Sequence, residues 1–138
     1  VERGGRLLGI CLGFQVMFEH SDEDGGVKTL GLLHGHVERL KGNVTHNGWE
    51  KFHHDLSDVK FKGCWRKARL TRRHILNGRF FYNHEYAAVN GSKKQFALPV
   101  SEALCQYSGL VIKKNVIGMQ FHPEKSQKSG AELLKFIL

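Results

Sequence analysis

Two short motifs, far apart in the chain, hold the side chains best suited to covalent chemistry. The first, GICLGFQ at residues 9–15, has the form of a nucleophile elbow, a sharp strand-to-helix turn with small residues around a reactive one. A thiol there lies at a helix N-terminus, where the helix dipole favours the thiolate. The next N–H points toward the substrate oxygen. We therefore predict Cys11 as a nucleophile and Leu12 as the donor of half an oxyanion hole.

The second motif is FHPEKS at residues 121–126, directly after an apolar segment. Pro123 fixes its own backbone angle and keeps His122 extended, so that His122 and Glu124 can project to the same side. A carboxylate that holds one ring nitrogen leaves the other free to take a proton from a thiol and to pass it to a leaving amine. We therefore predict His122 as general acid and base and Glu124 as the residue that orients it.

Each of these residues also has an ordinary interpretation. Cys11 could be a small buried cysteine at the end of a Gly-rich strand. A His-Pro-Glu tripeptide alone is more often a turn than a catalyst. Gln15 could be a helix surface residue, and Trp49 could be a packed aromatic.

Paired histidines raise the question of a metal site. His34 and His36 flank Gly35, and His53 adjoins His54; imidazoles at such spacing can share an ion. No cysteine or carboxylate cluster near either pair completes a ligand set. We interpret these histidines as surface or interface residues, and we expect neither a metal nor a cofactor.

The elements around the first motif follow from apolar spacing. Residues 6–10 read as a short buried strand, and Phe14, Met17 and Phe18 have helical spacing directly afterwards. Short apolar segments broken by glycine and asparagine then predict strands and turns, with strands at Leu32 to Leu40. The order strand, tight turn, helix is the one that the elbow requires.

Strands and one helix are predicted for the rest of the chain. The aromatic-rich segment from Arg79 to Val89 predicts a strand, and residues 110–112 and 116–121 predict a hairpin. The last residues, 130–138, give a helical apolar face with Ser129 as a candidate cap. No Pro-, Gly- or Ser-rich linker divides the chain, so we predict a single α/β domain with a mixed sheet.

Composition sets the class of protein. The chain has 138 residues, 41% of them hydrophobic, which is enough for one core. No apolar run approaches the roughly 20 residues that cross a bilayer, and three cysteines without paired spacing suit a reducing compartment. We expect a soluble, cytoplasmic protein. Val1 is neither an initiator Met nor the start of a signal peptide, so we expect a missing N-terminus.

The net charge of +8 and the basic run from Trp65 to His74 raise the possibility of nucleic acid or an acidic partner. Charge runs are usually solvated loops or edges. We interpret this run in that way.

Together, the two motifs make the chain resemble the class I (triad) glutamine amidotransferases. Supporting stretches are GLL at residues 31–33, HNGW at 46–49, FYNHEY at 81–86 and GMQF at 118–121. Within that family, the chain is similar to the glutaminase subunits of imidazole glycerol phosphate synthases. The resemblance implies a three-layer, flavodoxin-like fold with a mixed sheet whose first βα units are missing, so that residues 1–138 form the C-terminal two-thirds of a single domain.

The resemblance also implies roles for individual residues. Cys11, His122 and Glu124 are the catalytic triad of this family. Leu12 donates its N–H to the oxyanion, and Gly13 and Gln15 line the glutamine pocket.

By the same resemblance, His84, Glu85 and Tyr86 match the stretch that meets the amino-acid end of the substrate. Trp49 and Lys125 match positions that face the synthase subunit, beside the route taken by ammonia. We expect this fragment alone to lack part of the oxyanion hole, because the family supplies its other donor from a segment before the nucleophile.

The implied function is hydrolysis of glutamine to glutamate and ammonia through a thioester, with the ammonia passed to a synthase (cyclase) subunit in a heterodimer that serves histidine biosynthesis. The family usually has Met where Asn47 stands and Ser where Glu85 stands. These departures leave open a glutaminase that serves sugar amidation in surface polysaccharide assembly. A third hypothesis is an inactive fragment that acts as a basic binding module.

Overall fold

The computed structural model describes residue 1 and residues 3–55 and 75–138. Cys64 and the basic run from Trp65 to His74 lie outside the described residues. The elements, with η for a 3₁₀ turn, are β1 (Leu7–Ile10), α1 (Leu12–Gln15), β2 (His20–Ser21), η1 (Glu23–Gly25), β3 (Val27–Lys28), β4 (Gly35–Arg39), β5 (His46–Asp55), β6 (Ile75–His84), β7 (Tyr86–Asn90), β8 (Phe96–Pro99), β9 (Ser108–Lys113), β10 (Val116–Met119), η3 (Pro123–Lys125) and α2 (Gln127–Ile137).

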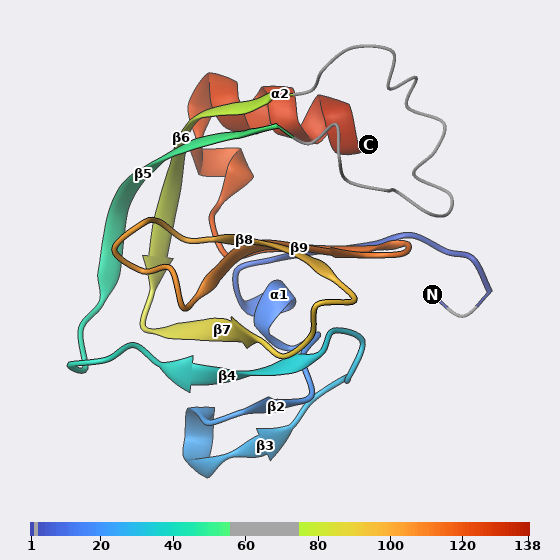
Figure 1. Cartoon of the computed structure of the whole chain (residues 1–138), viewed down its shortest axis with the longest axis vertical. Helices are drawn as coiled ribbons and strands as arrows, with labels where there is room; N and C mark the ends of the chain where they lie inside the picture. Colours follow the sequence, from blue (N-terminus) through green and yellow to red (C-terminus); the bar gives the residue numbers. More distant parts are fainter. Residues whose placement is uncertain (2, 56–74) are drawn as a thin grey trace.

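The strands form a central sheet, a second sheet and a ribbon (Figure 1). The central sheet has the order β1-β10-β9-β8, in which β1 runs parallel to β10 and the other pairs are antiparallel. The sheet is therefore mixed, as predicted, and the predicted hairpin is confirmed as β9 and β10. The second sheet has the order β3-β2-β4-β7, and β5 pairs with β6 in a two-stranded ribbon.

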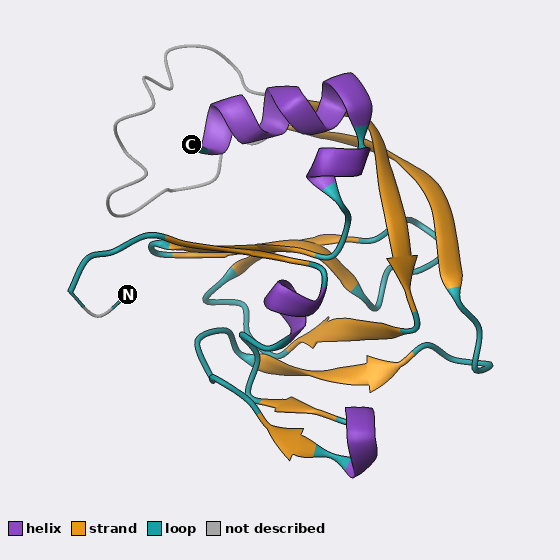
Figure 2. Cartoon of the chain, turned by 180° about the vertical axis from the view of Figure 1, so that it is seen from behind, coloured by secondary structure: helices purple, strands orange, loops and turns teal. Residues whose placement is uncertain are grey.

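The central sheet is covered on both faces. Successive side chains of β9 point to opposite sides of the sheet, and those on each side belong to a different buried cluster. Leu110 and Ile112 belong to the same buried cluster as Leu133 of α2. This cluster also contains apolar side chains of the ribbon. Val111 belongs to a second cluster with Phe14 of α1 and side chains of the second sheet. Both views place α2 and the ribbon on one side of the central sheet and α1 on the other (Figures 1 and 2).

Among the described strands, β1 lies at the edge of the central sheet, with β10 as its neighbour. A strand that leads into a nucleophile elbow usually lies in mid-sheet. The expectation that β1 has few neighbours in this chain is confirmed.

The helix of the first motif is shorter than the apolar spacing predicted. α1 ends at Gln15, and Met17 and Phe18 follow in tighter turns, although both of their side chains are buried. The carbonyls of Met17 and Phe18 accept the N–H groups of Leu33 and Gly31, at 2.8 and 2.7 Å. These hydrogen bonds join the residues after α1 to the returning segment, so the chain does not continue as a helix beyond them.

Glu85 divides the strand that was predicted from Arg79 to Val89. β6 ends at His84 and pairs with β5, whereas β7 begins at Tyr86 and pairs with β4. The carbonyl of Glu85 accepts the N–H of Leu40 at 2.8 Å. The chain therefore passes from the ribbon into the second sheet at this residue.

The predicted cap of the last helix is wrong. α2 begins at Gln127, with Ser126 at the N-cap position, because η3 has already reversed the chain. Ser129 lies inside the helix, where its hydroxyl accepts the backbone N–H of Arg79 at 3.2 Å. Its role is to attach α2 to the ribbon.

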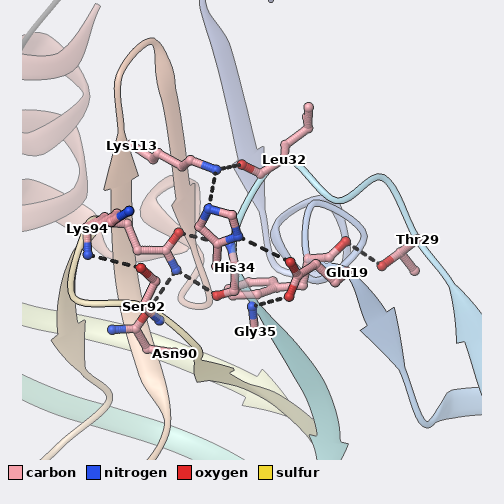
Figure 3. Close-up of polar contacts among 11 residues, drawn as sticks. Glu19, Thr29, Leu32, His34, Gly35, Asn90, Ser92, Lys94 and Lys113 are labelled. Atoms are coloured by element: carbon pink, nitrogen blue, oxygen red, sulfur yellow. Dashed lines mark hydrogen bonds and ion pairs between the residues drawn. The ribbon is translucent and has the colours of Figure 1, made fainter.

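A polar network centred on His34 attaches the segment after α1 to β9 (Figure 3). Lys113 Nζ donates to the carbonyl of Leu32 at 2.8 Å and lies 3.1 Å from His34 Nε2. His34 Nδ1 lies 3.2 Å from Glu19 Oε1, while Glu19 Oε2 accepts the N–H of Gly35 at 2.9 Å. That N–H and the His34 ring lower the pKa of Glu19. Both ring nitrogens of His34 are thus engaged within the protein.

The contact between α1 and β10 gives a prediction for stability. A Cβ on Gly118 would lie 2.1 Å from Cδ2 of the buried Phe14 ring, so Gly118→Ala forces the ring to move. We expect this variant to lose about 1–3 kcal/mol of unfolding free energy, measured by urea denaturation. Gly48→Ala is the matched control, because a Cβ there meets no atom within 4 Å. Equal stability of the two variants would contradict the packing described.

Candidate active site

The register of β1 against β10 brings the two motifs together. Ile10 is paired with Met119, and the N–H of Cys11 donates to the carbonyl of Met119 at 2.8 Å. Because the strands are parallel, the residues that follow them emerge at the same edge of the sheet. Cys11 therefore lies beside Gln120, just before the second motif.

The backbone at Cys11 has the geometry expected of a nucleophile elbow. Cys11 stands at the N-cap position of α1 with φ 51° and ψ −111°, a strained conformation that costs about 1–3 kcal/mol. A Cβ on Gly9 would lie 2.6 Å from the carbonyl oxygen of Gly13, so only glycine allows that approach. A Cβ on Gly13 itself would meet no atom within 4 Å.

The sulfur of Cys11 is held by polar groups from two other elements. Gln120 Nε2 donates to Cys11 Sγ at 3.7 Å, and the thiol lies 3.9 Å from the carbonyl of Asn83 on β6. Gln120 is fully buried, and its Oε1 accepts Gln15 Nε2 at 3.0 Å. We did not assign Gln120 a role from the sequence. The sequence signal that could have identified it is a polar residue at the end of an apolar strand, two positions before His122.

Burial dominates the electrostatics of the thiol. It raises the pKa of Cys11, and the charge of Glu124 raises it further, whereas the N–H of Leu12, the Gln120 amide and the charge of Lys125 lower it. The net effect is an increase, contrary to the expectation that a helix dipole would favour the thiolate. α1 has only four residues, so its dipole is small. The Leu12 N–H faces the sulfur, whereas its predicted part in an oxyanion hole stays a prediction.

The His122 and Glu124 side chains project to the same side, as the sequence predicted. His122 Nδ1 lies 2.7 Å from Glu124 Oε1. A carboxylate can only accept, so Nδ1 carries a proton and Nε2 is left for proton transfer. The N–H of His122 donates to the carbonyl of Phe81 at 2.8 Å, which fixes its backbone to the ribbon.

Two residues predicted at the glutamine pocket are tied to one backbone carbonyl. Gln15 is buried rather than on a helix surface, and its Nε2 donates to the carbonyl of Tyr86 at 2.7 Å. His84 Nδ1 donates to the same carbonyl at 2.8 Å. Burial lowers the pKa of His84 to about 4, so this ring is neutral near pH 7.

Glu85 is placed differently from its neighbours in the sequence. Its exposed side chain forms an ion pair with Arg39 at 3.2 Å and accepts the hydroxyl of Thr45 at 3.3 Å. The same Arg39 guanidinium lies 5.8 Å from the centre of the Tyr86 ring. The contacts of the Glu85 carboxylate thus lie outside the Cys11 network, the line of hydrogen bonds formed by Cys11, Gln120, Gln15, the Tyr86 carbonyl and His84.

Trp49 and Lys125 lie on the surface. Trp49, on β5, is 37% exposed, and its ring contacts that of Phe81 edge-on at 5.5 Å. The guanidinium of Arg79 lies 5.7 Å from the Trp49 ring. Trp49 is therefore partly packed and partly exposed to solvent. Lys125 ends η3 and lies near enough for its charge to act on Cys11.

A cavity of about 510 Å³ lies away from this network, between the far end of the ribbon and the segment after β8. Residues 51–53, 77–79 and 99–102 line it, and none of them is part of the Cys11 network. Within residues 3–55 and 75–138, no group of three or more His, Cys, Asp or Glu side chains is placed to hold a metal ion. The helices in the described part of the chain are too short or too polar to cross a membrane.

Comparison with known proteins gives one family and a set of relatives. The model of the family described as glutamine amidotransferase class-I matches residues 2–137. "Imidazole glycerol phosphate synthase subunit HisH" of Caldanaerobacter subterraneus subsp. tengcongensis is 37% identical over 137 residues, covering 98% of this chain and 62% of the relative. The protein of that name from Pyrococcus furiosus is 35% identical, covering 98% of this chain and 65% of the relative. The chain thus spans about three fifths of the length of such relatives.

Solved structures share the fold. The structure of PurLQS from Thermotoga maritima matches with a TM-score of 0.69 at 19% identity, over 99% of this chain and 62% of that chain. A crystal structure described as a glutamine amidotransferase matches with a TM-score of 0.60 at 18% identity, over 96% of this chain and 60% of that chain. The predicted fold class is confirmed.

The groups that shift the pKa of Cys11 predict opposite effects of two substitutions on that pKa. Glu124→Gln removes a charge that raises the pKa of Cys11, so that pKa should fall. Gln120→Leu removes a donor that lowers it, so that pKa should rise. The rate of Cys11 alkylation by iodoacetamide as a function of pH, followed by peptide mass analysis, measures both. Glu132→Gln on α2 is the control, and shifts in the same direction for the two site variants would contradict the electrostatics described.

Proposed function

Because the chain belongs to the class I glutamine amidotransferases, we propose that it carries the glutaminase site of its protein, which hydrolyses glutamine to glutamate and ammonia. The observation that carries the proposal is the parallel β1–β10 pair, which delivers Cys11 and the His122–Glu124 pair to one edge of the sheet. The presence of all three side chains at that edge supports a catalyst over an inactive fragment.

The chemistry follows from the groups present. The sulfur of Cys11 attacks the side-chain carbonyl carbon of glutamine, and the proton of the thiol passes to His122 Nε2. As the tetrahedral intermediate collapses, His122 returns that proton to the amide nitrogen, and ammonia leaves a thioester behind. Water then attacks the thioester with His122 as base, and glutamate and the free thiol are regenerated. Glu124 keeps the ring in the required tautomer throughout.

The raised pKa of Cys11 makes the base necessary. A half-buried thiol that is protonated at rest must lose its proton in the reaction itself, so the rate depends on how well the His122 ring is placed. The N–H of Leu12 faces the sulfur and is the donor proposed for the developing oxyanion.

The open approach above Gly13 and the buried groups around the Tyr86 carbonyl support a glutamine pocket beside Cys11. Gly13 leaves room next to the nucleophile, while Gln15 and His84 hold the backbone of the segment that would meet the amino-acid end of the substrate. The side chain of Glu85 is committed to Arg39. Its part in substrate binding is therefore proposed to be through the backbone.

Histidine biosynthesis is the proposed pathway, because relatives that share over a third of their residues with this chain are named as subunits of imidazole glycerol phosphate synthase. By that analogy, the ammonia passes to a synthase (cyclase) subunit in a heterodimer in the cytoplasm. These names do not favour the surface-polysaccharide alternative. We propose that the chain forms the C-terminal part of the amidotransferase domain, in keeping with its share of the relatives' length.

The outward face of the ribbon is the proposed site for the synthase subunit. Trp49 and Phe81 are cross-strand neighbours there, and the next pair along, Lys51 and Arg79, places two cations opposite each other. Like charges at such positions destabilise an isolated ribbon. An acidic surface on the partner would remove that repulsion. Lys125 is near enough to Cys11 for its charge to act on the thiol.

Substitutions in the triad test the proposed chemistry in protein expressed from its complete reading frame. A glutamine-mimicking electrophile should label Cys11 and not the exposed Cys105, which peptide mass mapping would decide.

His122→Asn should lower glutaminase turnover by about 10²- to 10⁴-fold, because it removes the proton carrier. Glu124→Gln should cost less, because it degrades only the orientation and basicity of the ring. Normal turnover in both variants would refute the triad.

Coupling to the partner gives a separate test. Trp49→Ala and Lys125→Ala should reduce the transfer of ammonia to the synthase subunit more than they reduce thioester formation at Cys11. Synthase product and glutamate would be measured together, with and without the nucleotide ligand of the synthase. Lys128→Ala, at an exposed position on α2, is the control. Stimulation by a sugar-amidating partner, without any response to a histidine-pathway partner, would reject the pathway and leave the glutaminase chemistry intact.

A further inference from the structure

A pair of side chains on the ribbon continues the polar network beyond His84. His46 Nδ1 lies 2.9 Å from His84 Nε2, and His46 Nε2 lies 3.0 Å from Glu50 Oε1. The side chains of His46 and Glu50 are only 14% and 29% exposed. Neither residue follows from the two sequence motifs, because a histidine and a glutamate four positions apart on a strand have no chemical signature of their own.

The hydrogen bonds fix where the protons lie. His84 Nδ1 faces a backbone carbonyl, that of Tyr86, so it carries a proton, and the Nε2 of this neutral ring can only accept. His46 must then donate through Nδ1. Its Nε2 faces a carboxylate oxygen of Glu50, and two acceptors cannot share a contact of 3.0 Å without a proton. The His46–Glu50 pair therefore holds one proton beyond a neutral ring and a free carboxylate.

Loss of that proton would force a choice between two contacts. A neutral His46 that donated to Glu50 would face His84 with a bare Nδ1. His84 would then have to donate through Nε2 and turn a bare Nδ1 toward the Tyr86 carbonyl. Burial disfavours a charged His84 that could satisfy both sides. The proton on the His46–Glu50 pair thus allows the contact with Glu50 and the contact between His84 and Tyr86 to exist together.

The Tyr86 carbonyl passes this constraint to the nucleophile. It also accepts Gln15 Nε2, and the same amide group donates to Gln120 Oε1. That contact orients the Gln120 amide so that its Nε2 faces Cys11 Sγ. An unbroken line of hydrogen bonds therefore runs from Glu50 on the ribbon to the sulfur.

We propose that Glu50 and His46 are positioning residues of the glutaminase site, which hold one proton between them and thereby fix the orientation of the amides beside Cys11. The proposal rests on the proposed function for its effect on turnover, but the line of hydrogen bonds itself does not. The ring of His46 is also packed against that of Tyr82, at 5.1 Å between centres, so its place on the ribbon is fixed sterically as well.

Three substitutions separate the hydrogen bond from the charge. Glu50→Ala removes the partner of His46, and His46→Phe removes the donor to His84; each should lower kcat/KM for glutamine about tenfold, the effect of one hydrogen bond of ordinary strength. Glu50→Gln should retain most of the activity, because its amide N–H can donate to the bare Nε2 of a neutral His46. Glu38→Ala is the matched control, because Glu38 forms a similar pair with His36 at 3.2 Å but is not linked to Cys11.

Two further measurements distinguish failure of this inference from failure of the proposed function. Near pH 7, imidazole ¹⁵N spectra of the full protein should show that His46 Nδ1 carries a proton and that His46 Nε2 shares a proton with Glu50. In Glu50→Gln, only Nδ1 should carry a proton. The rate of Cys11 alkylation by iodoacetamide should fall in Glu50→Ala and recover in Glu50→Gln. Absent glutaminase activity with these signatures present would overturn the function alone. A His46 protonated only on Nε2, or activity in Glu50→Ala equal to that in Glu38→Ala, would overturn the inference.

Discussion

The parallel pairing of β1 with β10 is the constraint on which the site depends. It brings residues from opposite ends of the sequence into register, with Ile10 opposite Met119, so that Cys11 and Gln120 emerge side by side. The tight packing of Phe14 over Gly118 holds α1 against the same strand. A shift of one residue in this register would turn every side chain of β1 to the opposite face and separate the motifs.

Polar groups are buried at this edge of the sheet at a cost that the hydrogen-bond network offsets. Gln15, His84 and Gln120 are all less than a tenth exposed, and each of them has partners. Partly satisfied buried networks are destabilising, whereas fully connected ones specify a single arrangement. The hydroxyl of Tyr82 is an exception among the described side chains, because it is buried without a partner.

The sequence predicted the features that depend on local pattern. The tight turn at Cys11, the side-by-side projection of His122 and Glu124, and the hairpin of β9 and β10 all follow from residue types at short spacing. The length of α1, the break at Glu85 and the role of Ser129 do not, because each is decided by a backbone or hydroxyl group from a distant segment. Gln120 belongs to the same class: its importance lies in contacts with Gln15 and Cys11, more than a hundred residues away along the chain.

The two faces of the ribbon explain how partner binding and catalysis could be coupled. Trp49 and Phe81 lie on one face, while their neighbours Glu50 and Tyr82 lie on the other, because side chains alternate along a strand. The carbonyl of Phe81 also holds the backbone of His122. Under the function proposed above, a partner bound to the aromatic pair would therefore act on the two strands that hold His122 and the line of hydrogen bonds to Cys11. In the proposed mechanism, His122 must take the proton of a thiol whose pKa is raised, so small changes in the placement of His122 would change the rate. Coupling of this kind needs no large conformational change.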